Sequence, residues 1–255
     1  MQRAAIVSAA ALMTLGLATT YAAAGGMLPA YLFAAVGDSA RPAEDKQRDA
    51  ERKPAETLGF AGVKPGEQVV ELAAGGGYFT RLLSAAVGPK GKVTVIVSPP
   101  KPDAAAGAPV PGAAVRAIAA DPHYANVQIS VQRISELTMP EKADLVWTTQ
   151  NYHDFHNIPD VDIATINRAV FGALKSGGTY FVLDHAAEAG SGARDTNTLH
   201  RIDKATVIKE VESAGFKLKG ESDILANNND PHTAKVFDPA IRGRTDQFIL
   251  KFTKP

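Results

Sequence analysis

The chain has 255 residues, with 27 lysines and arginines against 27 aspartates and glutamates, and it has no cysteine. This length is enough for one α/β domain with a full core. Zero formal charge without a basic block argues against nucleic acid as a partner, and the lack of cysteine excludes disulfides, thiolate metal sites and cysteine nucleophiles.

The first 36 residues are predicted to lie outside the folded domain. Arg3 precedes an uncharged apolar run, Ala4–Ala24, whose last residues are small enough to form a cleavage signal before Gly25. A second apolar piece, Met27–Val36, leaves cleavage near Val36–Ala40 as the other option. The first run is also nearly long enough for an uncleaved membrane anchor. The sequence therefore predicts an exported, bacterial periplasmic protein, with an inner-membrane anchor facing the periplasm as the alternative.

Residues 37–53 are predicted to form a polar linker and the start of a surface helix, Ala43–Leu58, that packs over the edge of a pocket. Residues 54–255 are predicted to form the main domain. There, strand and helix patterns alternate, which is typical of a parallel sheet with helices on both faces. The predicted strands are 68–72, 93–97, 127–131, 143–149 and 179–183, and the predicted helices are 78–87, 113–120, 161–174 and 202–214.

The end of the chain has a different pattern. Phe216–Leu225 and Gln247–Phe252 read as strands, and the polar stretch between them has no helical pattern. Two strands joined in this way predict an antiparallel hairpin at the edge of the sheet.

The most informative segment is a glycine-rich loop between a strand and a helix. The strand carries the acid Glu71 and is followed by Ala73 and by three glycines, Gly75 to Gly77. Glycine lets the backbone turn sharply and approach a ligand closely, because it has no Cβ. The helix N-terminus points its N–H groups into that turn. A plain tight turn is the alternative, but the strand–loop–helix context favours a nucleoside pocket at the carboxyl end of a first strand.

The run Glu71-Leu72-Ala73-Ala74-Gly75-Gly76-Gly77 resembles motif I of class I S-adenosylmethionine-dependent methyltransferases. The resemblance extends over about residues 54–255, with Leu174–Phe181 similar to their turn before strand 5 and Phe248–Phe252 to their last strand. It implies a Rossmann-like α/β fold with a mostly parallel seven-stranded sheet, helices on both faces and a C-terminal antiparallel hairpin. It also implies S-adenosylmethionine as cofactor. The cofactor-binding residues that it implies are Glu71, Ala73, Gly75, Gly76, Gly77 and Ser98.

A narrower resemblance is to a group of exported bacterial predicted methyltransferases. It rests on Asn151–Phe155, Asp184-His185, His200–Asp203 and Phe237–Gly243. The chain departs from the superfamily at two places. The end of strand 2, where an acid usually holds the ribose, has Val97 or Ser98, and the place of the acid that reads adenine has Gln132 or Arg133. One serine hydroxyl offers fewer and weaker hydrogen bonds than a carboxylate.

Histidines and aspartates follow strands 4 and 5 at the same predicted edge. His153 or His185 is predicted to act as a base, oriented by Asp154 or Asp184, because histidine titrates near neutral pH. His156 and His200 are predicted to lie on the same rim. Each histidine alone also has a structural explanation as a capping or strand-end residue. A metal site built from His153 and His156 with Asp184, His185 or His200 is a further alternative.

The predicted function is methyl transfer from S-adenosylmethionine to a small molecule, which needs little beyond alignment of the acceptor with the methyl group. No nucleic acid is predicted as a partner, and no membrane partner unless the N-terminal segment stays uncleaved. The alternative is an exported, non-catalytic small-molecule binding protein that retains the methyltransferase fold. Cofactor supply outside the cytoplasm and the two departures favour it, and the histidine and aspartate cluster disfavours it.

Overall fold

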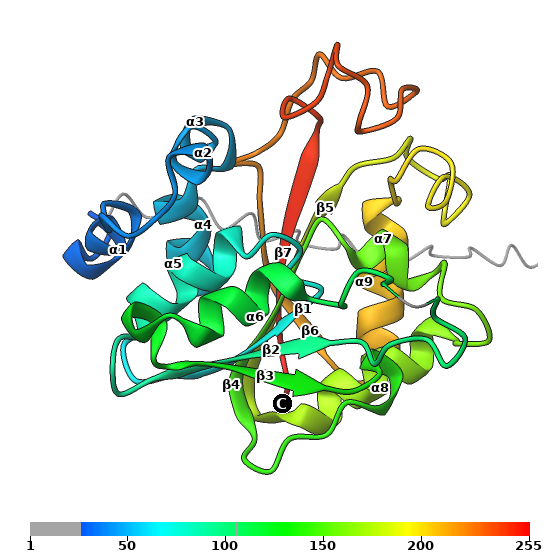
Figure 1. Cartoon of the computed structure of the whole chain (residues 1–255). Helices are drawn as coiled ribbons and strands as arrows, with labels where there is room; N and C mark the ends of the chain where they lie inside the picture. Colours follow the sequence, from blue (N-terminus) through cyan, green and yellow to red (C-terminus); the bar gives the residue numbers. More distant parts are fainter. Residues whose placement is uncertain (1–26, 106) are drawn as a thin grey trace, which may run out of the picture.

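The computed structural model describes residues 27–105 and 107–255. Within them one sheet of seven strands runs in the order β3-β2-β1-β4-β5-β7-β6 (Figure 1). β1 to β5 pair in parallel, whereas β7 is antiparallel to both β5 and β6. The predicted Rossmann-like sheet with a C-terminal antiparallel hairpin is therefore confirmed. The predicted signal sequence and the cleavage site before Gly25 lie outside the described residues and stay predictions.

The elements follow the predicted alternation closely. No helix in the described part of the chain is long and apolar enough to cross a membrane. The strands are β1 (Gln68–Leu72), β2 (Lys92–Val97), β3 (Val127–Val131), β4 (Ala143–Thr149), β5 (Leu174–His185), β6 (Lys217–Ser222) and β7 (Gln247–Thr253). The helices are α1 (Ala30–Val36), α2 (Ala43–Lys46), α3 (Asp49–Arg52), α4 (Pro54–Ala61), α5 (Tyr78–Val87), α6 (Ala113–Ala120), α7 (Tyr152–Phe155), α8 (Ile163–Ala173) and α9 (Lys204–Ser213), with short 3-10 turns at Pro122–Tyr124 and Ile134–Glu136.

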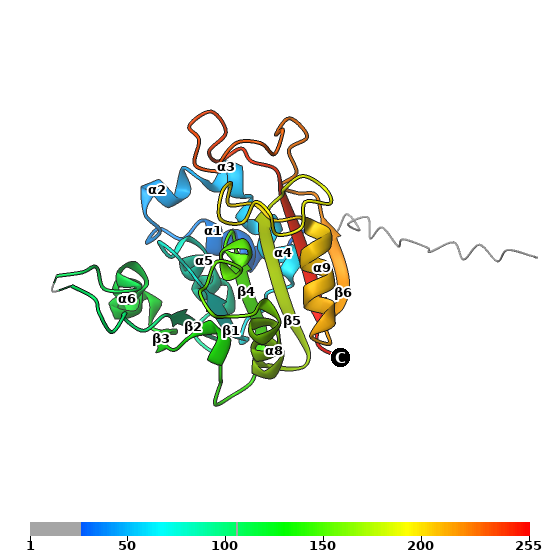
Figure 2. The same cartoon turned by 90° about the vertical axis from the view of Figure 1, so that its right-hand side faces the viewer.

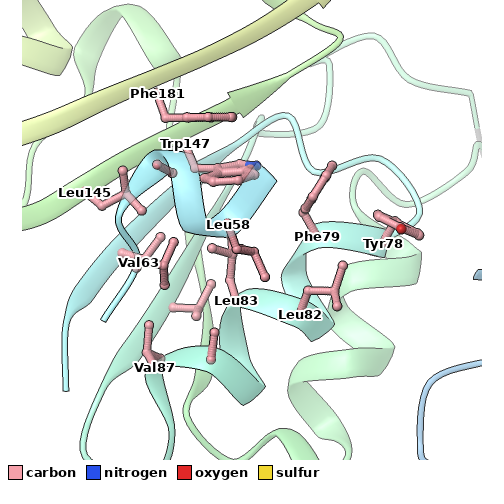
Figure 3. Packing of buried hydrophobic residues seen from close by; sticks show 14 of the residues in the cluster. Leu58, Val63, Tyr78, Phe79, Leu82, Leu83, Val87, Leu145, Trp147 and Phe181 are labelled. Atoms are coloured by element: carbon pink, nitrogen blue, oxygen red, sulfur yellow. The ribbon is translucent and has the colours of Figure 1, made fainter. Parts of the chain in front are cut away.

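Helices cover both faces of the sheet, because successive side chains of a strand point to opposite faces. In β4, Leu145 and Trp147 face a core shared with α1, α4, α5 and α6, whereas Val146 faces a core shared with α8 and α9. The first core is centred on Trp147, which stacks on Phe181 with ring centroids 4.0 Å apart (Figure 3).

The apolar piece Met27–Val36 is not outside the fold, which corrects the sequence-based boundary at residue 36. Its residues 30–36 form α1, which packs on α4 and α5. Leu32 and Ala35 are 1% and 2% exposed in the first core. The sequence misled here because the apolar side of a short amphipathic core helix is composed like the end of a signal sequence. Cleavage near Val36–Ala40 would remove this core helix.

The predicted helix Ala43–Leu58 is also wrong as a single element. Three short helices, α2 to α4, replace it. The break between α3 and α4 lies at Lys53, which adopts a left-handed conformation with φ of 41° directly before Pro54. A residue before proline is disfavoured in the α-helical region. Strand β5 is longer than predicted. Leu174 pairs with Ala143, and regular pairing resumes at Thr179 after an irregularity that contains the predicted Gly-Gly turn.

The carboxyl ends of β1, β4 and β5 meet at one edge of the sheet. The short helices α2 and α3 and the long segments after β5 and β6 gather over this edge (Figure 2). In open α/β sheets, ligands bind at this edge, where the strand order reverses. The reversal lies here between β1 and β4.

Candidate functional site

A cleft of about 260 Å³ lies where β1 ends. It is bounded by the glycine-rich loop, by the short helices α2 and α3, and by the residues that follow β4. Its lining residues are Asp45, Arg48, Arg52, Glu71, Ala73, Ala74, Gly75, Gly76, Tyr78, Phe79, Thr149, Gln150 and Asn151. We call it the loop cleft. The helix predicted to pack over the pocket edge thus does so, in broken form.

The loop conformation explains its small residues. Ala73, Gly75 and Gly77 have φ of 51°, 58° and 82°, a region in which glycine has no steric penalty. The Asn151 side chain donates to the Ala73 carbonyl oxygen at 2.9 Å and ties the loop to the end of β4. A Cβ on Gly77 would lie 2.1 Å from Ile118 Cδ1, so this glycine serves helix packing and does not line the cleft. A Cβ on Gly76 would meet nothing within 4 Å.

Glu71 lies at the floor of the loop cleft with 1% of its surface exposed. The Thr80 hydroxyl donates a hydrogen bond of 2.6 Å to its carboxylate. Burial raises the pKa of Glu71 to about 7, and the bond from Thr80 only partly offsets this. Glu71 therefore changes charge near neutral pH and can gain a full negative charge when a cation lies beside it.

Glu71→Gln is expected to remove a pH dependence of stability. An acid with a raised folded pKa makes folding less favourable as pH rises above its unfolded value, here from about 4.5 to about 7. The full effect is about 3 kcal/mol, of which about 2 kcal/mol falls between about pH 5.5 and about pH 8.5. Urea unfolding at both pH values should show the variant gaining that much stability relative to wild type. Glu56 is exposed, so Glu56→Gln is the control for loss of a carboxylate. If the stabilities of wild type and Glu71→Gln change equally between the two pH values, the raised pKa of Glu71 is wrong.

Arg52 supplies positive charge to the loop cleft without a carboxylate partner. Its Nη2 donates to Gln150 Oε1 at 2.6 Å, and its guanidinium lies 4.6 Å from the Tyr78 ring centroid. Within residues 27–105 and 107–255, no acidic group lies within ion-pair distance of it, since the neighbouring Asp49 pairs with Arg41 instead. Burial, followed by the nearby Arg48, lowers the pKa of Arg52 to about 10, so the group stays charged at neutral pH. A half-buried guanidinium of this kind favours an anionic ligand, and its planar fork matches the geometry of a carboxylate or a phosphate.

A second, smaller cleft of about 120 Å³ adjoins the first and shares Arg48, Arg52 and Gln150 with it. We call it the side cleft. Gln150, with φ of 59°, stands between the two and donates to Gln247 Oε1 at 2.8 Å. The remaining lining residues of the side cleft are Glu51, His185, Val236, Phe237, Arg242, Gly243, Thr245 and Gln247. The segment Phe237–Gly243, one of those that carry the sequence resemblance, thus reaches the candidate site.

Asp184 organises two of the predicted catalytic histidines. One of its oxygens lies 2.7 Å from His153 Nδ1 and accepts from the His185 backbone N–H, and the other accepts from the His153 backbone N–H. Burial alone lowers the pKa of His153, but the charges of Asp184 and Asp154 and the Asp184 hydrogen bond raise it overall. His185 places Nδ1 2.8 Å from the Thr245 hydroxyl, and burial lowers its pKa to about 4.

The four histidines predicted on one rim separate into two groups. His153, His185 and His200 lie together, with the ring centroid of His153 6.1 Å from that of His185 and 5.4 Å from that of His200. His156 is the exception, because its Nε2 points to Glu210 of α9 at 3.1 Å. The predicted pairing of His153 with His156 in a metal site is therefore wrong. Of the predicted catalytic residues, His185 lines the side cleft, whereas His153, Asp154 and Asp184 line neither the loop cleft nor the side cleft, and His153 is 2% exposed.

The predicted cofactor residues also separate. Glu71, Ala73, Gly75 and Gly76 line the loop cleft, whereas Ser98 is exposed after β2 and lines neither cleft. Sequence reasoning missed Arg52, Gln150 and Gln247. The one sequence signal for Arg52 is its place in the predicted helix Ala43–Leu58, which is expected to pack over the edge of the pocket. A larger cleft of about 610 Å³ lies beside the amino end of β2, but it contains none of the loop residues.

The strands, the helices and the glycine-rich loop define a Rossmann-like α/β protein with a cleft at the end of its first strand, and comparison with solved structures specifies the fold further. A methyltransferase from Aquifex aeolicus dependent on S-adenosylmethionine superposes with a TM-score of 0.57 at 16% identity, over 84% of this chain and 99% of that one. The [4+2]-cyclase SpnF gives 0.59 at 17% identity, over 89% and 92%. The glycopeptide N-methyltransferase MtfA in complex with S-adenosylmethionine gives 0.52 at 15%, over 79% and 86%.

The chain therefore has the class I methyltransferase fold. No protein-family model matches the sequence, and a comparison with curated proteins gives no significant match. Because a cyclase shares the fold, the fold alone does not establish the reaction, which depends on the residues of the site.

Proposed function

We propose that the protein binds S-adenosylmethionine in the loop cleft and transfers its methyl group to a small molecule. The observation that carries the proposal is the half-buried Arg52 guanidinium, which lies in the cleft beside a glycine-rich loop and has no acidic partner among the described residues. The amino-acid end of the cofactor has a carboxylate and an ammonium group. Arg52 and Arg48 suit the carboxylate, and Glu71 with the loop carbonyl oxygens suits the ammonium group. When bound, the cofactor supplies an electrophilic methyl group.

The side cleft is the proposed place of the methyl acceptor. It shares a wall with the loop cleft, and its volume of about 120 Å³ fits a small acceptor or one part of a larger one. His185 and Thr245 offer polar groups to an acceptor there. Asp184 acts as a positioning residue, since its carboxylate fixes the backbone at both His153 and His185. Alignment of the acceptor with the methyl group is then the main contribution of the protein.

Arg52→Gln tests the cofactor assignment. Wild-type protein is expected to bind S-adenosylhomocysteine saturably in calorimetry, and the variant to bind it about 10- to 100-fold more weakly, because one charged hydrogen-bond partner is lost. Binding of 5′-methylthioadenosine, which lacks the amino-acid end, should be the same in both. Arg168→Gln, an exposed arginine of α8, is the matched control.

Two results would contradict this assignment. If wild-type protein does not bind S-adenosylhomocysteine at millimolar concentration, the assignment of S-adenosylmethionine as cofactor is wrong. An equal loss of both ligands in Arg52→Gln would show that the variant changes the cleft as a whole and not the carboxylate contact. The non-catalytic alternative shares the binding step, so transfer of a labelled methyl group to candidate acceptors is what separates it from the enzyme.

A further inference from the structure

Three potential metal ligands meet at the edge of α7, beside the side cleft. They are His153 and Asp154 of α7 and His200 from the segment before α9, and one ligand atom of each lies within 4.8 Å of the others. Asp154 Oδ1 is 3.4 Å from His153 Nε2 and 3.4 Å from His200 Nδ1. Two imidazoles and a carboxylate thus come together from two segments that are 46 positions apart in the chain, at residues 154 and 200.

We propose that His153 Nε2, Asp154 and His200 Nδ1 bind a divalent transition-metal ion. Zinc binds nitrogen at about 2.0–2.1 Å and carboxylate oxygen at about 2.0–2.2 Å, so two ligands of a tetrahedral ion are about 3.4 Å apart. Both separations from Asp154 match this value, and the two imidazole nitrogens lie within 4.8 Å of each other, so a small side-chain adjustment completes the site. Imidazole with one carboxylate suits zinc and its neighbours in the first transition row better than magnesium or calcium, which prefer oxygen ligands only.

The surroundings of His153 support this arrangement. Asp184, which is fully buried, lies 2.7 Å from His153 Nδ1 and accepts its proton in a hydrogen bond, so that Nε2 presents its lone pair to Asp154. A carboxylate behind a ligating histidine is the common outer shell of metal sites, where it fixes the tautomer and the ring orientation.

His200 is held in place by a constrained backbone. It adopts φ of 57°, which is unfavourable for a residue with a Cβ. The next residue, Arg201, is fully buried and pairs with Asp230 at 2.9 Å, and this anchors the segment. The His200 ring also packs on the edge of Phe237, with centroids 4.9 Å apart. The constraint therefore points the ring toward Asp154.

The proposed site is open to solvent on one side. The side chains of Asp154 and His200 are 45% and 29% exposed, so an ion can enter and can keep a water molecule or another ligand in its remaining position. Because Phe237 lines the side cleft and contacts His200, that position lies close to the place proposed for the acceptor. The metal site does not depend on the proposed function, since none of its three ligand residues lines the loop cleft.

Calorimetric titration of the full chain with zinc chloride, after dialysis against a chelator, tests the proposal. One equivalent of zinc is expected to bind and to raise the melting temperature, because a ligand of the folded state stabilises it. Asp154→Asn and His200→Gln should each weaken binding at least about tenfold, and Asp184→Asn about 10- to 100-fold. Cobalt in place of zinc should give the visible absorption of a four-coordinate ion. His232→Gln is the matched control, because His232 pairs with Asp246 at 2.9 Å outside the cluster.

The absence of saturable zinc binding, or equal affinity in wild type and His200→Gln, would overturn the proposal and leave the cluster as a set of His–Asp polar contacts. Melting curves in chelator show whether a variant is folded. Asp154→Asn keeps the side-chain shape at a partly exposed position, so it decides the matter even if His200→Gln unfolds. Binding of S-adenosylhomocysteine, measured separately, distinguishes failure of this site from failure of the loop cleft.

Discussion

Gly76→Val is expected to reduce binding of S-adenosylhomocysteine by at least about 100-fold while the protein stays folded. Gly76 lines the loop cleft, and a Cβ built on it meets no atom within 4 Å, so a valine side chain fills space that the ligand needs. Its φ is not in the left-handed region, so valine introduces no backbone strain there. The unfolding free energy should therefore stay within about 0.5 kcal/mol of wild type, as for other surface substitutions.

Calorimetry with S-adenosylhomocysteine measures the binding loss, and urea unfolding measures the stability. Gly172→Val on α8 is the matched control, because its Cβ also meets nothing within 4 Å and it lies outside both clefts. Gly77→Val is a poor choice, since its Cβ would clash with Ile118 and its loss of binding would reflect unfolding. Unchanged affinity in a folded Gly76→Val protein would show that the loop does not hold the cofactor.

Leu32→Ala is expected to lower the free energy of unfolding by about 2–5 kcal/mol, the usual range for a fully buried leucine. Leu32 is 1% exposed and packs in the core shared by α1, α4 and α5. Figure 1 shows α1 beside these two helices. The cost combines the lost burial of apolar surface with the cavity that remains.

Phe33→Ala gives the contrast, because Phe33 is the next residue and is 56% exposed. Urea unfolding of both variants in the full chain should show a large loss for Leu32→Ala and a change within about 0.5 kcal/mol for Phe33→Ala. If both variants match wild type, α1 contributes nothing to the fold, and the domain boundary predicted at residue 36 is right after all.

The side cleft and the metal cluster have a practical consequence for any assay of methyl transfer. If His153, Asp154 and His200 bind an ion as proposed, a chelator in the buffer would remove it from a position next to that proposed for the acceptor. Assays with and without added zinc therefore need to be compared before an acceptor is rejected.

The class of fold and the position of the loop cleft follow from local features of the sequence. Alternating apolar segments, the glycines after Glu71 and the paired strands at the end of the chain are local signals, and each is set by backbone sterics or side-chain periodicity over a few residues. The sheet, its hairpin and the strand–loop–helix unit at residues 68–87 accordingly form as predicted.

Contacts between residues far apart in the sequence depend instead on how the elements pack. Arg52 reaches Gln150 across 98 positions, and Asp184 reaches His153 across 31, because strand order and register bring α3 and the ends of β4 and β5 together. His200 approaches Asp154 because its backbone is in the left-handed region, with φ of 57°, which the local sequence does not predict. The apolar residues of α1 could belong to a signal sequence or to a core helix, and its packing on α4 and α5 is what distinguishes the two. Such contacts arise from long-range packing, and local patterns do not encode them.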